Sequence, residues 1–434
     1  MQGLTAWKQR AAALCALAPL VFLAASKGVG TGASYTSITE HYQVGSDISN
    51  GFTELVGRHM EAMYREYTRR FSGFARKVPG KFTVKVFARQ ADYNEAVPEN
   101  LRGTTGAFVS RERALLAYKE GRTDEEVLRS LYHEGFHQFA FTCISQDLPL
   151  WVNEGLAEYF SEAVWNGQGF TTGQVPAGRL RLLREALNGK SHIPLKDLLA
   201  MESEQWLGNV RLDQSRASMQ YCEVWSIVHY LVLSEGGRNL QKLLEYLRKI
   251  SSGVSRDEAF KQSFGPDVKA FERAWADYVM KLKLGPDDVC RKNLETLSFM
   301  ALSYYRDPAR FVSLNAFRNA VLSRRVKWEV TTSDGEKIDS SDKARAAALF
   351  RCPYDQGQGA LSYTLSRDPQ SGLPVLLCTH HRGVVLKAYY VPKHDGALGV
   401  RVEQVARGTL QRSVSNSGEA PNSNRTRPDE TGKH

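Results

Sequence analysis

The hydrophobic positions in the N-terminal third of the chain predict one helix followed by strands. Between residues 51 and 71 the apolar side chains recur at helical spacing, which is typical of a helix with one buried face. Residues 81–87 alternate between polar and apolar side chains, as a half-buried strand does. Two further apolar runs, at residues 106–109 and 114–118, also predict strands.

The middle of the chain has the period of α-helices. Thr123 and Glu126 have the spacing of a capping box, which predicts that a helix begins there. After a loop that contains Pro149, residues 151–165 predict a second helix. Further helices are expected at residues 218–234, at 239–250, from a second capping box at Ser255, and at 267–284.

Beyond about residue 286 the pattern changes to short apolar stretches separated by Gly, Pro and Asp, which predicts a smaller β-rich domain. Strands that precede a group of helices favour an α+β fold over alternating βαβ units. The expected boundaries are 1–33 for a signal peptide, 34–285 for the α+β domain, 286–407 for the β-rich domain and 408–434 for a disordered tail. Strands in the β-rich domain are expected at residues 326–332, 359–365, 373–379 and 383–391.

The N-terminus has the features of a secretory signal. Lys8 and Arg10 precede an apolar stretch at residues 11–25, and small residues follow it. The stretch is shorter than the roughly 20 apolar residues of a transmembrane helix. We therefore expect cleavage after Ser26 or Ala33 and an exported protein that is secreted, periplasmic or at the cell surface. Contact with a membrane is expected only if the segment stays uncleaved.

Charge and cysteine content exclude two classes of function. The formal net charge is +10, but the basic residues are scattered among acidic ones, so no nucleic-acid partner is expected. The cysteines include no C-x-x-C pair, which argues against a structural zinc knuckle. Cys352 and Cys378 could pair after export; the alternative is that the cysteines are small buried apolar residues.

The sequence HEGFH at residues 133–137 carries the candidate chemistry. Two histidines four residues apart lie on one face of a helix and can reach the same ion, with Glu134 beside them. Catalytic zinc takes three protein ligands and keeps a fourth position open. Glu154, early in the next predicted helix, would return to the level of His133 and His137 as the third ligand. Glu158, one turn later, is the competing carboxylate; it could instead hydrogen-bond a ligand histidine or be solvated.

These two segments resemble those of a known enzyme family. YHEGFH at residues 132–137, followed by LWVNEGLA at residues 150–157, resembles the gluzincin zinc metallopeptidases of the peptidase MA-like group. The likeness is greatest to an uncharacterised secreted branch known only as a domain of unknown function. The resemblance implies a zincin-like catalytic domain in which His133, His137 and Glu154 bind Zn²⁺. It also implies that Glu134 is the general base and that the substrate is a peptide or protein.

The resemblance extends to features outside the two motifs. Tyr221 is similar in position to a tyrosine that donates a hydrogen bond to the oxyanion in related aminopeptidases. The alternative is that Tyr221 is an aromatic residue of the core. Residues 114–118 immediately precede the HEGFH helix, so we expect them to be the edge strand that binds extended substrate. Residues 103–108 lack the Glu and Asn with which aminopeptidases hold a free amine, so an endopeptidase or a narrow-specificity peptidase is expected.

The sequence leaves two classes of function open. The first is an exported zinc peptidase. The alternative is a non-catalytic zincin-fold binding protein at the cell surface, which is disfavoured because a scaffold has no need of Glu134 beside the metal. A purely structural zinc is also disfavoured, since no nearby Cys or His would close the fourth position.

Overall fold

The computed structural model describes residues 35–74, 78, 80–305, 313–323, 328–331, 337–339, 341–351, 363–368, 370–379, 385–392 and 397–405. The expected signal peptide and tail lie outside these residues, as does Cys352, so its pairing with Cys378 stays a prediction. Within the described part of the chain, no helix is long and apolar enough to cross a membrane.

The N-terminal sheet is mixed, with three parallel strands in its middle and an antiparallel strand at each edge. The prediction that residues 114–118 form the edge strand is wrong, because β5 lies between β3 and β4. All five residues of β5 are buried and apolar, without the alternation of a half-exposed strand, and this composition suits an internal position. The order is β1 (Tyr35–Ile38), β2 (Tyr42–Ser46), β3 (Phe82–Phe87), β5 (Ala114–Tyr118) and β4 (Gly106–Val109).

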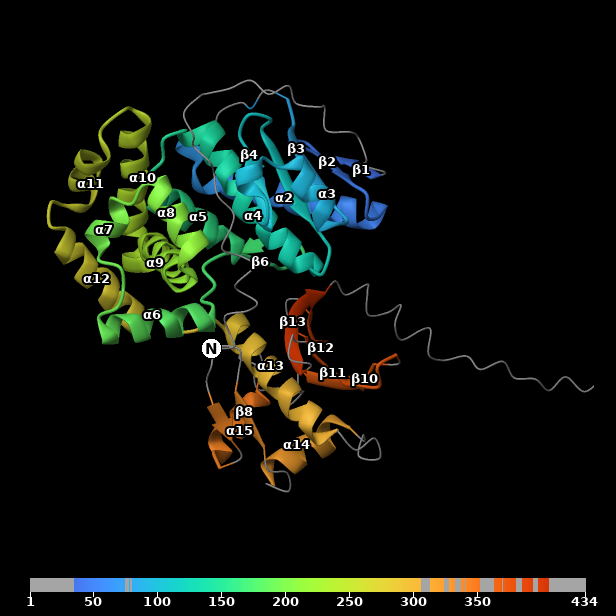
Figure 1. The fold of residues 1–434 in the computed structure, drawn as a ribbon. Coiled ribbons are helices and arrows are strands. Elements are labelled where there is room, and N and C mark those ends of the chain that lie inside the picture. The colour runs from blue at the N-terminus through green and yellow to red at the C-terminus, as the bar shows by residue number, and fades with distance from the viewer. Residues whose placement is uncertain are drawn as a thin grey trace, which may run out of the picture.

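Two long helices, α2 (Asn50–Arg70) and α4 (Asp124–Phe139), pack beside each other and against this sheet (Figure 1). The capping box that was predicted at the start of α4 is present, with Thr123 and Glu126 satisfying each other's backbone N–H groups. Tyr67 of α2 donates a hydrogen bond of 2.6 Å to the carbonyl of Tyr132, one residue before HEGFH. The contacts of α4 with the sheet and with α2 therefore fix its position along α2 and its rotation about its own axis.

Helix α5 (Leu150–Ser161) follows α4 and packs between α4 and α9 (Gln214–Leu233). A Cβ on Gly155 would lie 2.6 Å from the carbonyl oxygen of Val224, so only glycine allows α5 to approach α9 this closely. The predicted helix 151–165 ends four residues earlier than expected, because the chain turns at residues 166–169 and pairs β6 (Val164–Trp165) with β7 (Phe170–Thr171).

The remaining helices cover α9 and α5, on the left of Figure 1, or connect strands. The predicted helices at 239–250, from Ser255 and at 267–284 are confirmed as α10, α11 and α12, whereas α3, α6, α7 and α8 were not predicted. These elements are α3 (Gln90–Ala96), α6 (Ala177–Gly189), α7 (Leu195–Leu199), α8 (Ser203–Leu212), α10 (Arg238–Ser251), α11 (Arg256–Phe264) and α12 (Val268–Lys281), with the short turns η1 (Ser72–Phe74), η2 (Glu99–Leu101), η3 (Ala140–Ile144) and η4 (Ser234–Gly237).

The C-terminal part is β-rich as predicted, but it begins with a 19-residue helix, α13, that the sequence pattern did not reveal. This helix packs against an antiparallel sheet of order β10-β11-β12-β13. The elements are α13 (Pro286–Tyr304), α14 (Leu314–Leu322), β8 (Glu329–Thr331), β9 (Lys337–Asp339), α15 (Lys343–Leu349), β10 (Tyr363–Arg367), β11 (Pro374–Thr379), β12 (Val385–Pro392) and β13 (Leu398–Val405).

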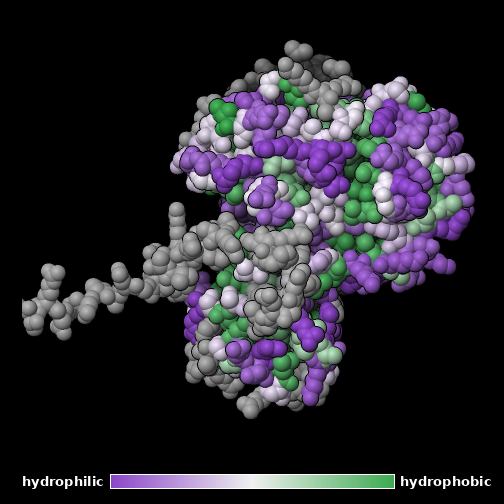
Figure 2. All heavy atoms as spheres, turned by 180° about the vertical axis from the view of Figure 1, so that it is seen from behind, coloured by the Kyte–Doolittle hydropathy of each residue, from purple (hydrophilic) through white to green (hydrophobic). Residues whose placement is uncertain are grey.

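The buried hydrophobic residues form two separate clusters in the described part of the chain. One runs from Tyr42 to Val279, and the other begins at Cys290 on α13. Figure 1 shows the C-terminal sheet and α13 below the larger α+β part. Figure 2 shows hydrophilic residues over much of one face, with hydrophobic residues visible between them. The fold is therefore α+β with a second, β-rich C-terminal part.

A buried carboxyl group on α9 predicts how the stability of the fold depends on pH. Glu223 accepts a hydrogen bond of 2.7 Å from the backbone of Ile193, and burial raises its pKa to about 8. In the unfolded chain it ionises near pH 4, so its contribution to the free energy of unfolding is present below that pH and is lost as pH rises to about 8.

We therefore expect Glu223→Gln, which keeps an acceptor for Ile193 but does not titrate, to flatten this pH dependence. Between pH 5 and pH 8 the wild-type protein should lose stability relative to the variant by about 1 kcal/mol per pH unit. Urea unfolding of both proteins at pH 5, 6, 7 and 8 measures the difference. Parallel curves would contradict the assignment.

Candidate metal centre

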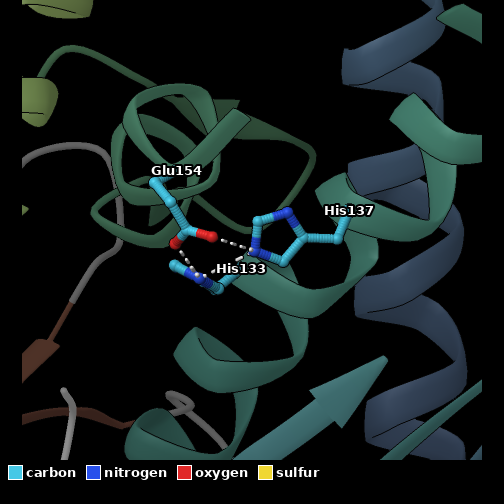
Figure 3. Close-up of side chains that lie close together, drawn as sticks. All are labelled: His133, His137 and Glu154. Carbon is cyan, nitrogen blue, oxygen red and sulfur yellow. Dashed lines mark hydrogen bonds and ion pairs between the residues drawn. The ribbon is translucent and has the colours of Figure 1, made fainter. Parts of the chain in front are cut away.

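Three side chains from α4 and α5 converge in the interior of the larger part. His133 and His137 are one turn apart on α4, and their Nε2 atoms lie 3.0 Å from each other. Glu154 extends from α5 toward both rings, as Figure 3 shows. Its Oε2 lies 3.5 Å from Nε2 of His133, and its Oε1 lies 3.6 Å from Nε2 of His137. All three residues are buried.

The carboxylate of Glu154 has an unusual environment for a buried charge. Neither oxygen accepts a hydrogen bond from any described residue. One oxygen lies 3.5 Å from Nε2 of His133 and the other 3.6 Å from Nε2 of His137, which is longer than an ordinary hydrogen bond. Buried polar groups without a hydrogen-bond partner are rare in native proteins, so a bound ion or another group is expected beside this carboxylate. A cation between these three side chains would satisfy them all.

The outer nitrogen of each imidazole is engaged by a partner that orients the ring. Oδ1 of Asn153 lies 3.1 Å from Nδ1 of His137, and Oε1 of Glu158 lies 3.2 Å from Nδ1 of His133. Acceptors at Nδ1 keep a proton on that nitrogen, so Nε2 of each ring is the atom through which a metal ion would bind. The structure thus places Glu158 outside the converging group. Sequence reasoning did not assign a role to Asn153, although it directly precedes Glu154.

The pKa values of the two histidines are shifted in opposite directions. Burial alone would lower the pKa of His133, but Glu154 and Glu158 hold it well above its usual value. Burial lowers the pKa of His137 to about 4, so this ring is neutral near pH 7. Burial would raise the pKa of Glu158, but Arg179 on α6, and after it His133, lower it to about 2. Glu158 is therefore an anion paired with the buried Arg179, a residue that the sequence did not single out.

Glu134 lies beside the converging side chains and is fully buried. Its Oε2 accepts a hydrogen bond of 2.9 Å from the backbone N–H of Phe108, on the edge strand β4. Its Oε1 has no hydrogen-bond partner among the described residues. Burial, with Glu154 nearby, raises the pKa of Glu134 to about 7 although His133 opposes the shift. A carboxyl with a pKa near neutrality can take up and release a proton.

Tyr221 lies on α9, the helix that packs against α5, and it is buried. Its hydroxyl accepts a hydrogen bond of 3.2 Å from Nε1 of Trp206. Burial and the carboxylates of Glu154 and Glu158 raise its pKa well above the usual value, so it remains a neutral phenol. The fold thus brings Tyr221 close enough to Glu154 and Glu158 for their charges to affect its pKa.

A second group of possible ligands, Glu40, His41 and Glu61, lies nearer the surface. Glu61 is 2.7 Å from Nδ1 of His41 and also accepts a hydrogen bond from the backbone of His41. Glu40 is exposed and lies 4.0 Å from the other ring nitrogen. Because Glu61 is satisfied by His41 itself, this group is explained as an ion pair.

Comparison with known protein families gives one partial match. A family described as a protein of unknown function, DUF1570, matches residues 128–276. The matched segment contains the three converging residues, but it leaves out the N-terminal sheet and the whole C-terminal part. No curated protein and no solved structure matched the chain. The comparisons therefore show likeness to an uncharacterised family over residues 128–276, and the relation to gluzincins stays a prediction.

Proposed function

We propose that this protein is an exported zinc-dependent peptidase of the gluzincin type. The observation that carries the proposal is the buried convergence of His133, His137 and Glu154 beside the carboxyl of Glu134. The carboxylate oxygens of Glu154 accept no hydrogen bond from the described residues. A His₂Glu ligand set that leaves one position open is typical of catalytic zinc. The expected signal segment, outside the described residues, supports export.

The spacing of the ligand atoms fits zinc. Zinc bonds of about 2.0–2.1 Å in a tetrahedral arrangement place neighbouring ligand atoms roughly 3.3–3.4 Å apart. The three separations in this group, 3.0, 3.5 and 3.6 Å, bracket that value. When bound, zinc would supply Lewis acidity, polarising the scissile carbonyl and lowering the pKa of water toward neutrality.

The chain's own groups supply the proton transfers. Glu134 takes the proton from the attacking water on Oε1, while the N–H of Phe108 holds Oε2 in place. It then donates that proton to the amine of the leaving product. Asn153 and Glu158 hold the two imidazoles at their Nδ1 atoms, so the rings keep their orientation through the reaction. Tyr221 is the candidate donor to the oxyanion.

This geometry favours a peptidase over a non-catalytic binding protein. A binding scaffold would gain nothing from Glu134, a buried carboxyl with one oxygen that has no hydrogen-bond partner among the described residues, because such burial costs folding free energy. The substrate is a peptide or protein. Because β5 is internal, extended substrate cannot pair with residues 114–118, and the nearby sheet edge belongs to β4.

The first prediction from the proposed function separates metal binding from catalysis. Purified wild-type protein should contain one zinc per chain and cleave peptides in a diverse library. Glu134→Gln should keep the zinc, because residue 134 is not a ligand, and lose cleavage because an amide cannot accept the proton. His137→Ala should lose both. Metal analysis by mass spectrometry and library cleavage followed by peptide sequencing provide the two measurements.

A folded wild-type protein without stoichiometric metal would refute the proposal. Zinc without cleavage in any sample would instead favour the binding-protein alternative. Glu54→Gln, which removes a carboxyl from the exposed side of α2, is the matched control and should change neither result.

The second prediction concerns Tyr221. Tyr221→Phe keeps the aromatic ring and its packing but removes the O–H group. If the phenol donates to the oxyanion, kcat should fall about 10²–10³-fold with little change in KM or zinc content. Loss of the acceptor for Trp206 should cost about 1 kcal/mol of stability, which thermal unfolding would report. An unchanged kcat would assign Tyr221 to the core.

A further inference from the structure

The candidate metal centre is connected to the C-terminal part of the chain by a continuous series of ion pairs. The series begins at Glu158, whose Oε1 faces Nδ1 of His133. The other oxygen of Glu158 pairs with Arg179 of α6. The same guanidinium nitrogen lies 3.2 Å from Oε1 of Glu162, one turn further along α5. Arg179 thus joins two carboxylates of like charge on one helix face.

From Glu162 the series crosses back to α4 and then leaves the larger part. Arg129 lies 2.8 Å from Oε2 of Glu162 and 3.2 Å from Oε1 of Glu125. Glu125 pairs with Arg291 of α13 at 2.9 Å. Its second oxygen accepts a hydrogen bond of 2.6 Å from the backbone of Gln404 on β13. Both final partners belong to the C-terminal part. We call the whole set, Glu158, Arg179, Glu162, Arg129, Glu125 and Arg291, the ion-pair series.

Alternation of charge makes the members of the ion-pair series interdependent. Three carboxylates alternate with three guanidinium groups, and no side chain in the series is more than 19% exposed. A buried charge that loses its partner is strongly destabilising, so removal of one member drives its neighbour toward the next available partner. Without Arg291, Arg129 would be drawn toward Glu125 and away from Glu162, and Arg179 would then be drawn from Glu158 toward Glu162.

We propose that the C-terminal part is a positioning element of the metal centre, and that Arg291 acts on His133 through the ion-pair series. The inference rests on the proposed role of His133 as a zinc ligand. Arg291 is a positioning residue, since it touches neither ligand nor substrate. Under this proposal, zinc affinity depends on Arg291, which lies outside the segment that matches the family, residues 128–276.

The test measures zinc affinity instead of activity. Arg291→Met keeps the aliphatic stem and removes the charge. We expect it to weaken zinc binding about tenfold, the lower end of what loss of a partner to a metal-binding histidine causes. Competition with a chromogenic chelator at pH 7 gives the affinity. The visible absorption spectrum of the cobalt-substituted protein, which reports ligand geometry, should shift as well.

Arg401→Met is the matched control. Arg401 lies on β13, in the same C-terminal part as Arg291, and pairs with Glu126 of α4 at 3.4 Å, but Glu126 is outside the ion-pair series. Its loss should leave zinc affinity and the cobalt spectrum unchanged. If Arg401→Met weakens zinc binding as much as Arg291→Met does, the effect belongs to the contact in general and the proposal is overturned.

A double-mutant cycle with Glu158→Gln tests whether the effect of Arg291 on zinc binding passes through Glu158. Arg291 and Glu158 have no contact with each other among the described ion pairs, so independent effects would multiply. If the series transmits the effect, Arg291→Met should weaken zinc binding in the wild-type background and hardly at all beside Glu158→Gln. Equal effects in both backgrounds, or no effect in either, would overturn the inference.

Two further results keep the outcomes separable. Wild-type protein that binds no zinc refutes the proposed function, whereas zinc-binding wild type with an unaffected Arg291→Met refutes only the role of Arg291. Should Arg291→Met fail to fold, Arg291→Gln, which also removes the charge, replaces it in the cycle, and Arg291→Lys is measured by itself as the variant that conserves the charge. Lysine keeps the charge without the guanidinium plane, so it should retain most of the zinc affinity and the wild-type cobalt spectrum. A tenfold loss in Arg291→Lys would count against the proposal.

Discussion

The burial of Glu154 is the constraint on which the rest of this structure depends. An ionised carboxylate in the interior costs several kcal/mol unless opposite charge compensates it. Here the neighbouring groups are two imidazoles whose nitrogens lie too far away for good hydrogen bonds, and the cation that we propose between the three side chains would compensate the carboxylate. To bring the three residues together, α4 and α5 must lie side by side in the core. The close approach of α5 to α9 at Gly155 then holds α5 in place.

The centre of this arrangement could be predicted from sequence because it depends on local geometry. Spacing of four on a helix places His133 and His137 on one face regardless of the surrounding fold. The capping box at Thr123 marks where that helix begins, and the structure confirms it. The position of Glu154 required only a short connection between two helices. For Glu158 the sequence left three possibilities, and the structure selects one by placing its carboxylate at the outer nitrogen of His133.

The features that were missed depend on contacts between distant segments. β5 and β4 are both short apolar runs, and only pairing with β3 decides which of them becomes internal. Helix α13 has buried apolar residues at helical spacing, Cys290, Leu294, Leu297 and Ala301, but the polar residues Asn293, Thr296 and Ser298 lie between them and made this pattern harder to recognise in the sequence. Arg179 carries no local signal at all. It lies 21 residues beyond Glu158, and nothing in sequence indicates that its guanidinium is buried against that carboxylate.

Glu125, in the first turn of α4, interacts both with its own helix and with a distant segment of the chain. Three acidic residues stand there, and anions at a helix N-terminus are favourable by about 0.3–1 kcal/mol each. That gain accounts for an exposed acid, but it is smaller than the several kcal/mol that a largely buried carboxylate such as Glu125 costs. Arg291 and Arg129 compensate the remaining cost of burying Glu125. Burial by itself would raise the pKa of Glu125, but the two arginines lower it below its usual value. One of them comes from 166 residues further along the chain. The charge of Glu125, on the helix that carries His133 and His137, is therefore fully compensated only when Arg291 of α13 pairs with it.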